Sequence, residues 1–321
     1  MRITPARYRQ VAIAALWALA AIIVSGAAVR LTDSGLGCDD WPNCSSTKLI
    51  DVSSRHAAIE QINRFFTGVV GLAVIVAVLA SLWRVPRRRD LTQLSIALVV
   101  GVLANAVLGG ISVLVDLHPL AVQGHLLLSM ALIVTGATLV RRSGQPDGVA
   151  RERTVSDSTH KLVVAHFVVT CVAIITGTWV TGAGPHAGDE DAPRLDVAIR
   201  TVAQIHGVTV MITLAIALAI AGAIRRTRSD AAAITTPLST WIFLGALQAA
   251  IGYIQYFNDV PALLVGIHVA GATAVMFAAT QLLLSTSAPG VPDNYDTTTG
   301  TRSTTGTSET NDRAAFAADV S

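Results

Sequence analysis

Long runs of apolar residues, separated by short polar segments, dominate the pattern of this chain. Each run is long enough to cross a bilayer whose hydrocarbon core is about 30 Å thick. The pattern therefore predicts an all-α integral membrane protein with eight transmembrane helices. We expect these helices near residues 11–30, 59–82, 91–114, 119–140, 161–182, 198–223, 236–257 and 261–285.

The composition agrees with this prediction and excludes an ordinary soluble domain. Hydrophobic residues make up 52% of the chain and charged residues 14%, and the mean hydropathy is +0.58. The first apolar run lacks a convincing cleavage site before Arg30, so we interpret it as a retained span rather than a signal peptide.

Basic residues are distributed unequally between the polar segments. Most belong to the N-terminus and to every second gap between spans, which form one side of the membrane. The positive-inside rule then predicts a multi-pass protein of the cell membrane with both termini in the cytoplasm. The basic residues on that side are Arg2, Arg7, Arg9, Arg84, Arg87, Arg88, Arg89, Arg141, Arg142, Arg151, Arg153, Lys161, Arg225, Arg226 and Arg228.

The second half of the chain repeats the first with an offset of 143 positions. Asn63 and His125 align with His206 and His268, and the neighbouring letters align as well. This duplication predicts two pseudo-symmetric four-helix bundles, related by an axis along the membrane normal. We expect a first half at 1–140, a cytoplasmic linker at 141–160, a second half at 161–285 and a disordered cytoplasmic tail at 286–321.

The aligned histidines are the first candidate site. A lone intramembrane histidine is usually a packed, hydrogen-bonded residue, but His206 and His268 are expected at one depth, roughly 10 to 12 Å from the outer end of their helices. Two facing imidazoles suit the axial positions of a haem iron. His125 and Asn63 are expected about 9 Å deep in the first half, so the sequence predicts a haem-handling protein with a second site there.

Glu60 is a second candidate, because its counterpart in the repeat is Ala203 and only the first half has this carboxylate. It is placed to act on whatever occupies the first bundle, or it is a helix-start acid paired with Arg64 one turn later. We expect Arg64 either to hold Glu60 ionised or to anchor a propionate of a bound haem.

Cys38 and Cys44 lie in the first outer loop, where an oxidising environment favours a disulfide. The bond is either a staple of the loop or a redox pair that exchanges electrons with a nearby haem. His56 is left unresolved, and the other histidines are interpreted as structural or solvated.

The ordered set of motifs resembles the haem A synthase family over about residues 8 to 285. The set comprises two four-span halves, the outer cysteine pair, E-x-x-N-R opening the second span, and single histidines opening spans four, six and eight. The resemblance is to an actinobacterial-type variant, since the better-known pattern is E-x-x-H-R. It implies an oxidoreductase that oxidises a methyl group of haem O to a formyl group, by successive hydroxylations with water-derived oxygen, in support of terminal oxidase assembly.

The resemblance also implies roles for individual residues. His206 and His268 would ligate a haem b, His125 would be an axial ligand of the substrate haem O, and Glu60 would assist the hydroxylation. Asn63 and Arg64 are expected to contact the substrate haem. With Asn63 in place of a histidine, we favour a substrate haem that is five-coordinate through His125; ligation by His56 is the alternative.

Haem O synthase is the expected partner that supplies the substrate. The electron acceptor stays unnamed, a homo-oligomer is left open, and no nucleic-acid partner is expected. The rival hypothesis is a di-haem membrane cytochrome that transfers electrons without modifying haem, and a carrier of haem or another ligand is a third.

Overall fold

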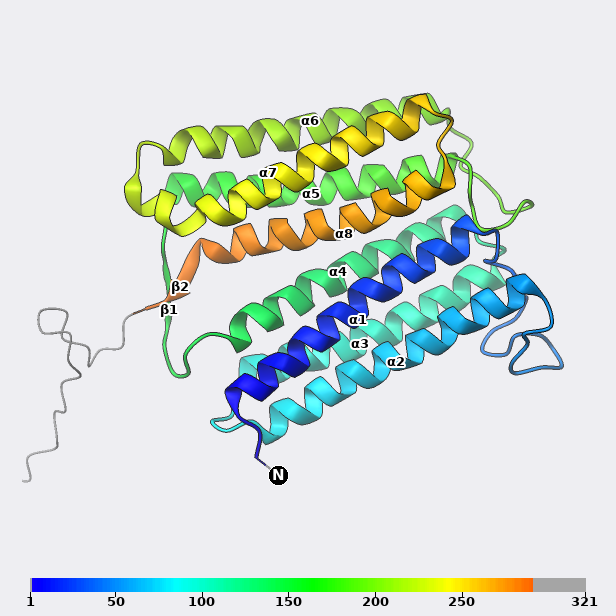
Figure 1. The fold of residues 1–321 in the computed structure, drawn as a ribbon, viewed down its shortest axis with the longest axis horizontal. Helices are drawn as coiled ribbons and strands as arrows, with labels where there is room; N and C mark the ends of the chain where they lie inside the picture. The colour runs from blue at the N-terminus through cyan, green and yellow to red at the C-terminus, as the bar shows by residue number, and fades with distance from the viewer. Residues whose placement is uncertain (1, 291–321) are drawn as a thin grey trace, which may run out of the picture.

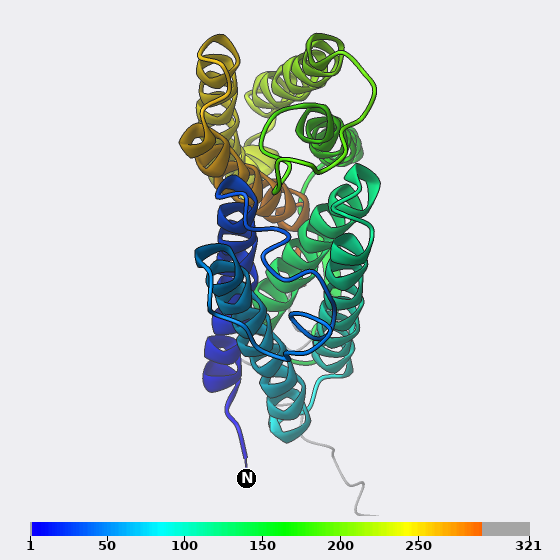
Figure 2. The ribbon, with the colours of Figure 1, turned by 90° about the vertical axis from the view of Figure 1, so that its right-hand side faces the viewer.

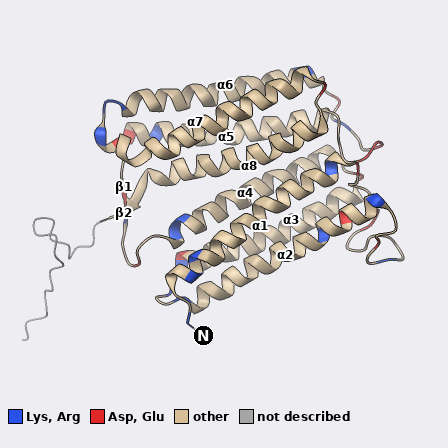
Figure 3. Cartoon of the chain, in the orientation of Figure 1, with Lys and Arg blue, Asp and Glu red and all other residues tan. Residues whose placement is uncertain are grey.

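The computed structural model describes residues 2–290, and these residues contain eight helices long and apolar enough to cross a membrane. This confirms the helical class and the eight predicted spans (Figure 1). Charged residues lie towards the two ends of the helices and in the loops that join them, which leaves the central parts of the helices uncharged (Figure 3). The helices are α1 (Pro5–Leu31), α2 (Arg55–Trp83), α3 (Arg89–Leu114), α4 (Pro119–Ser143), α5 (Asp157–Ala183), α6 (Ile199–Ile224), α7 (Arg228–Phe257) and α8 (Ala262–Ser285).

Several helices begin earlier than the apolar pattern predicts, because polar residues continue the helix outside the membrane-spanning stretch. α2 is capped by Ser54, whose hydroxyl accepts a hydrogen bond from the Ala57 N–H. Ser156 caps α5 in the same way, through the N–H of Thr159. Such caps fix the first turn, so apolar periodicity alone places these starts too late.

In the described chain, the helices of each half of the repeat pack on one another, and the two halves are also in contact. Within the first half α1 packs on α2 and α4, and α3 packs on the same two helices; within the second half α6 and α8 both pack on α5 and α7. α8 also packs against α1 and α4, which joins the halves (Figures 1 and 2). The predicted symmetry axis between two bundles stays a prediction.

The duplication is visible in the backbone. Asp116 and Leu117, before α4, both have positive φ angles (52° and 58°), and Asp259 and Val260, before α8, have φ angles of 55° each. These pairs lie at equivalent positions of the repeat, and positive φ is uncommon for residues other than glycine. The same turn therefore precedes the fourth helix of each half, on which the aligned histidine lies.

The predicted tail boundary at residue 286 is wrong for the first few residues. The short strand β2 (Ser287–Pro289) pairs antiparallel with β1 (Arg151–Arg153), which lies inside the predicted linker. This ladder, extended by a hydrogen bond of 3.0 Å from Thr154 N–H to the Thr286 carbonyl, satisfies backbone groups of both segments. Residues 291–321 of the predicted tail lie outside the described residues.

Candidate functional site

The second half brings His206 of α6 and His268 of α8 together. Their ring centroids lie 6.4 Å apart, and the ring planes are inclined at 80°. An imidazole nitrogen lies about 2 Å from a metal that it coordinates, and the ring centre about 1 Å further out, so two rings on one metal have centroids about 6 Å apart. The spacing of this pair would therefore allow both imidazoles to hold a single metal ion.

A hydrogen bond orients the imidazole of His206. Nδ1 of His206 lies 3.3 Å from Oγ1 of Thr176, and that hydroxyl lies 3.0 Å from Oγ1 of Thr209. Nε2 is the nitrogen that such an arrangement leaves for a metal. Gln248 donates to the main-chain carbonyl of His268 at 2.6 Å, while the buried Nδ1 of His268 has no hydrogen-bond partner among the described residues.

Two imidazoles leave most coordination positions of a metal ion to be filled by another group. Within residues 2–290 no three His, Cys, Asp or Glu side chains gather as a metal-binding cluster. A pair of opposed imidazoles is a complete protein ligand set for a haem, where the porphyrin supplies the remaining nitrogens. The residues present thus fit a haem at His206 and His268.

A glycine on the preceding helix touches each candidate ligand. A Cβ atom at Gly177 would lie 3.1 Å from Cε1 of His206, and one at Gly252 would lie 3.2 Å from Cε1 of His268. In the first half, a Cβ at Gly109 would lie 3.0 Å from Cε1 of His125. The sequence shows that Gly109 and Gly252 are equivalent in the repeat, but their contact with the histidines appears only in the fold.

Gly252→Ala should displace the His268 ring, because the added methyl group occupies the space against which the imidazole packs. We expect about a tenfold loss of haem retained per protein, since misplaced ligands bind metal more weakly. The measurement is the ratio of haem absorbance to protein after purification. Gly222→Ala on α6 is the control, because a Cβ there meets no atom within 4 Å; an equal loss in both variants would contradict the packing role.

His125 of α4 is the corresponding residue of the first half. Its Nδ1 lies 3.0 Å from the main-chain carbonyl oxygen of Asn105 on α3, so Nδ1 carries the proton and Nε2 keeps a lone pair. Asn105 in turn donates to Ser129 at 2.8 Å. Asn105 and Gln248 are equivalent in the repeat. The main-chain carbonyl of Asn105 binds the His125 ring, and the Gln248 side chain binds the main-chain carbonyl of His268. The offset of 143 positions therefore pairs these two residues as well as the two histidines.

Asn63 lies on α2 and accepts a hydrogen bond of 2.8 Å from the Ser25 hydroxyl of α1. No hydrogen bond joins Asn63 and His125 among the described residues. His56, at the start of α2, has its Nδ1 3.0 Å from Oγ of Ser34, in the loop that follows α1. The predicted contacts of Asn63 and His56 with a substrate haem stay predictions.

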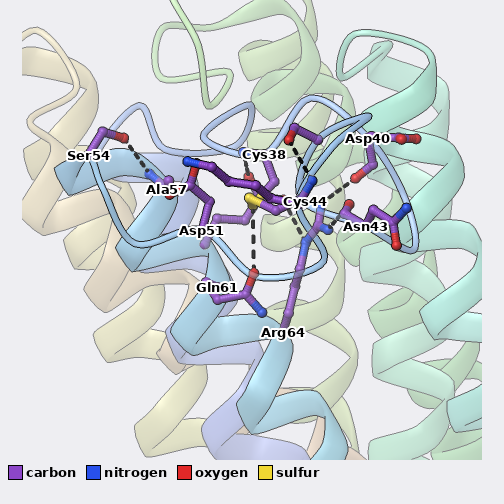
Figure 4. The surroundings of a disulfide bond; sticks show 12 residues. Cys38, Asp40, Asn43, Cys44, Asp51, Ser54, Ala57, Gln61 and Arg64 are labelled. Atoms are coloured by element: carbon purple, nitrogen blue, oxygen red, sulfur yellow. Dashed lines mark hydrogen bonds and ion pairs between the residues drawn. A yellow bond between two sulfur atoms is a disulfide. The ribbon is translucent and has the colours of Figure 1, made fainter.

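Glu60 is buried, with 5% of its surface exposed, and both of its carboxylate oxygens accept hydrogen bonds. Oε1 accepts from Nε and Nη2 of Arg64 at 3.0 and 2.7 Å, and Oε2 accepts from the Cys38 N–H at 2.7 Å. The remaining donors of Arg64 bind the carbonyls of Asn43 and Asp40 at 2.8 and 2.9 Å (Figure 4). Glu60 and Arg64 thus join the second helix to the outer loop.

The disulfide between Cys38 and Cys44 is present, as predicted, and both cysteines are buried. Between them, Trp41 packs against Gly110 of α3, the neighbour of the glycine that touches His125. The outer loop therefore extends from Glu60 on α2 to the helix that supports His125. The redox role of the cysteine pair stays a prediction.

Other histidines have structural contacts. His166 is fully buried and meets Trp241 edge to face, with ring centroids 4.1 Å apart. His118 accepts from the Leu120 N–H at the start of α4, His160 lies 3.1 Å from the Thr286 hydroxyl, and His186 lies 3.0 Å from the Val260 carbonyl. These contacts agree with the structural interpretation of the four residues.

The fold and site define the chain as a multi-pass helical membrane protein in which histidines are held between helices. The model of the family described as cytochrome oxidase assembly protein (COX15-CtaA) matches residues 9–58 and 47–280. The chain belongs to this family.

Curated relatives agree with the family assignment. The chain is 29% identical over 168 residues to Heme A synthase of Exiguobacterium sibiricum, covering 51% of this chain and 55% of that protein. It is 29% identical over 177 residues to Heme A synthase of Shewanella oneidensis, covering 50% and 52%, and 31% identical over 104 residues to that of Lysinibacillus sphaericus, covering 32% and 34%. The aligned part of the chain thus spans about half the length of the first two relatives.

Proposed function

We propose that this chain is a haem A synthase, an oxidoreductase that converts the methyl group of haem O to the formyl group of haem A for terminal oxidase assembly. Membership of the cytochrome oxidase assembly family and similarity to proteins named Heme A synthase support the activity. The structural observation that best supports the proposal is the pairing of His206 with His268, whose ring centroids lie 6.4 Å apart, a spacing that suits a haem. The proposed location is the cell membrane, with both termini in the cytoplasm.

The two halves have different roles in this proposal. His206 and His268 would hold a resident haem b, which when bound supplies one-electron transfer. His125 would bind the substrate, haem O, through Nε2, because its Nδ1 is committed to the Asn105 carbonyl. We assign the oxidation of the substrate to the first half because it has Glu60, whereas the equivalent residue in the second half is Ala203.

Glu60 would orient the water that attacks the substrate methyl carbon and accept a proton from it. Arg64 holds the carboxylate in place through two hydrogen bonds and stabilises its charge. Because the other Arg64 donors bind loop carbonyls, the geometry favours a role in holding Glu60 ionised over the alternative of anchoring a haem propionate.

The reaction needs an electron acceptor and a source of substrate. Converting a methyl group and water to a formyl group releases electrons and protons, so a one-electron carrier must pass the electrons onward. We propose haem O synthase as the partner that delivers the substrate; the acceptor is unnamed, and its contact with the cysteine pair is part of the same hypothesis.

Pigment extraction from the purified full-length chain tests the activity. We expect haem B together with haem O or haem A from cells that make haem O, and haem A accumulation that depends on this chain. Haem B alone would favour the rival di-haem cytochrome, which gives no task to a carboxylate in one half. A protein without pigment would favour a carrier and contradict the synthase.

A further inference from the structure

A recess lined by arginine side chains lies at the end of the helices where α3 begins and α4 ends. Its volume is about 480 Å³, large enough for a polar headgroup, and it does not belong to the histidine sites. Three chain segments form its walls: the turn between α2 and α3, the segment after α4, and β2. The charged residues lining it are Arg87, Arg88, Arg89, Asp90, Arg142 and Arg151.

The walls of the recess are tied together. Nη1 of Arg88 donates to the carbonyls of Arg142 and Gln145 at 3.0 and 3.1 Å, which joins the turn before α3 to the end of α4. Arg151 donates to Ser287, and it faces Pro289 in the strand pairing. Hydrogen bonds therefore hold the walls of the recess in place relative to one another.

Positive charge in the recess exceeds the negative charge available to balance it. Asp90 pairs with Arg88 at 2.7 Å and lies 3.8 Å from Arg142, while Asp147 pairs with Arg84 at 2.8 Å. The remaining lining arginines, Arg87, Arg89 and Arg151, have no carboxylate within ion-pair distance in the described part of the chain.

The environment of Arg151 agrees with an anionic occupant. Burial, and then the positive charges of Arg142 and Arg141, lower the pKa of the Arg151 guanidinium, and a bound anion would offset both effects. α3 starts in the recess at Arg89, and Asp90 in its first turn is the carboxylate that lines the recess.

We propose that this recess binds the phosphate headgroup of an anionic phospholipid. Guanidinium groups match phosphate oxygens in charge and in hydrogen-bond geometry. The recess lies at the start of α3 and the end of α4, two helices long and apolar enough to cross a membrane, and Trp83 and Val85, shortly before it in the chain, expose apolar side chains. The assignment needs only that the chain spans a bilayer, and it is independent of the proposed haem chemistry.

Native mass spectrometry of the full-length chain in detergent tests this proposal with added phosphatidylglycerol and, in parallel, phosphatidylcholine. We expect preferential retention of phosphatidylglycerol, and about tenfold weaker binding to the variant R87Q/R89Q/R151Q. The matched control is R225Q/R226Q/R228Q, which removes the same charge at the turn between α6 and α7. It should bind within about twofold of the unmodified chain, because these arginines do not line the recess.

Three outcomes would overturn the proposal: unchanged binding in the recess variant, an equal loss in both triple variants, or displacement of the lipid by millimolar inorganic pyrophosphate. An equal loss would mean general surface attraction, and displacement would mean a site for free phosphates. Arg89→Gln alone provides a second test should the triple variant fail to fold, since Arg89 is exposed and unpaired within residues 2–290; about threefold weaker binding is expected.

Discussion

Replacing His206 or His268 with alanine should remove the haem of the second half from the purified protein. Each change deletes one of two rings that lie 6.4 Å apart, so a haem would keep a single axial imidazole. Changes in groups that only orient a ligand already weaken metal binding about 10- to 100-fold, and loss of the ligand itself should weaken it at least as much. The measurement is low-spin haem absorbance per protein.

His160→Ala is the matched control for these variants. His160 lies on α5 of the same half, at the opposite end of the helix from Gly177, and its ring contacts Thr286. We expect the control to keep its full complement of pigment. An unchanged haem spectrum in both His206→Ala and His268→Ala would refute the proposed ligand pair.

Glu60→Gln should lower haem A formation at least about 100-fold, because general acid–base groups contribute about 10²- to 10⁴-fold to catalysis. The amide keeps the size of the side chain but loses the charge that pairs with Arg64 at 2.7 Å. Haem content should stay close to that of the unmodified chain. The measurements are haem A produced, haem bound and the thermal unfolding midpoint.

Arg64→Lys separates catalysis from the structural role of Glu60 in the outer loop. This change keeps a positive charge beside the carboxylate but disrupts the hydrogen bonds to the Asn43 and Asp40 carbonyls. If Glu60 acts on the substrate, Glu60→Gln will lose far more activity than Arg64→Lys at similar stability. Parallel losses of activity and stability in the two variants would reduce Glu60 to an anchor of the loop.

The helices could be predicted because one physical requirement, a continuous apolar surface facing lipid, determines most residues of each span. The first residue of each helix is harder to predict from the sequence. α7 begins at Arg228, whereas the apolar pattern places it near 236, because the polar residues of its first turns carry no signal of a membrane span. The pairing of β1 with β2 leaves no sequence pattern for a related reason: three-residue strands are too short to show periodicity.

The repeat predicted which positions would face one another in the second half, and His206 and His268 do lie together. It could not predict what holds the site of the first half. Binding of Arg64 to the Asn43 carbonyl and packing of Trp41 against Gly110 depend on the path of an irregular loop, which leaves no periodic trace. The hydrogen bond from Ser25 to Asn63 could not be predicted either, because the two residues lie on different helices.

The pairing of β1 with β2 has a topological consequence for the second half. Because Arg153 and Ser287 are partners in the ladder, the chain enters and leaves this half at one point, and α5 to α8 form a closed circuit. Units whose ends meet tolerate circular permutation. Joining the ends there and opening the chain between Ile224 and Arg228 would leave all four helices intact, so we expect this half to accept a new order of its helices.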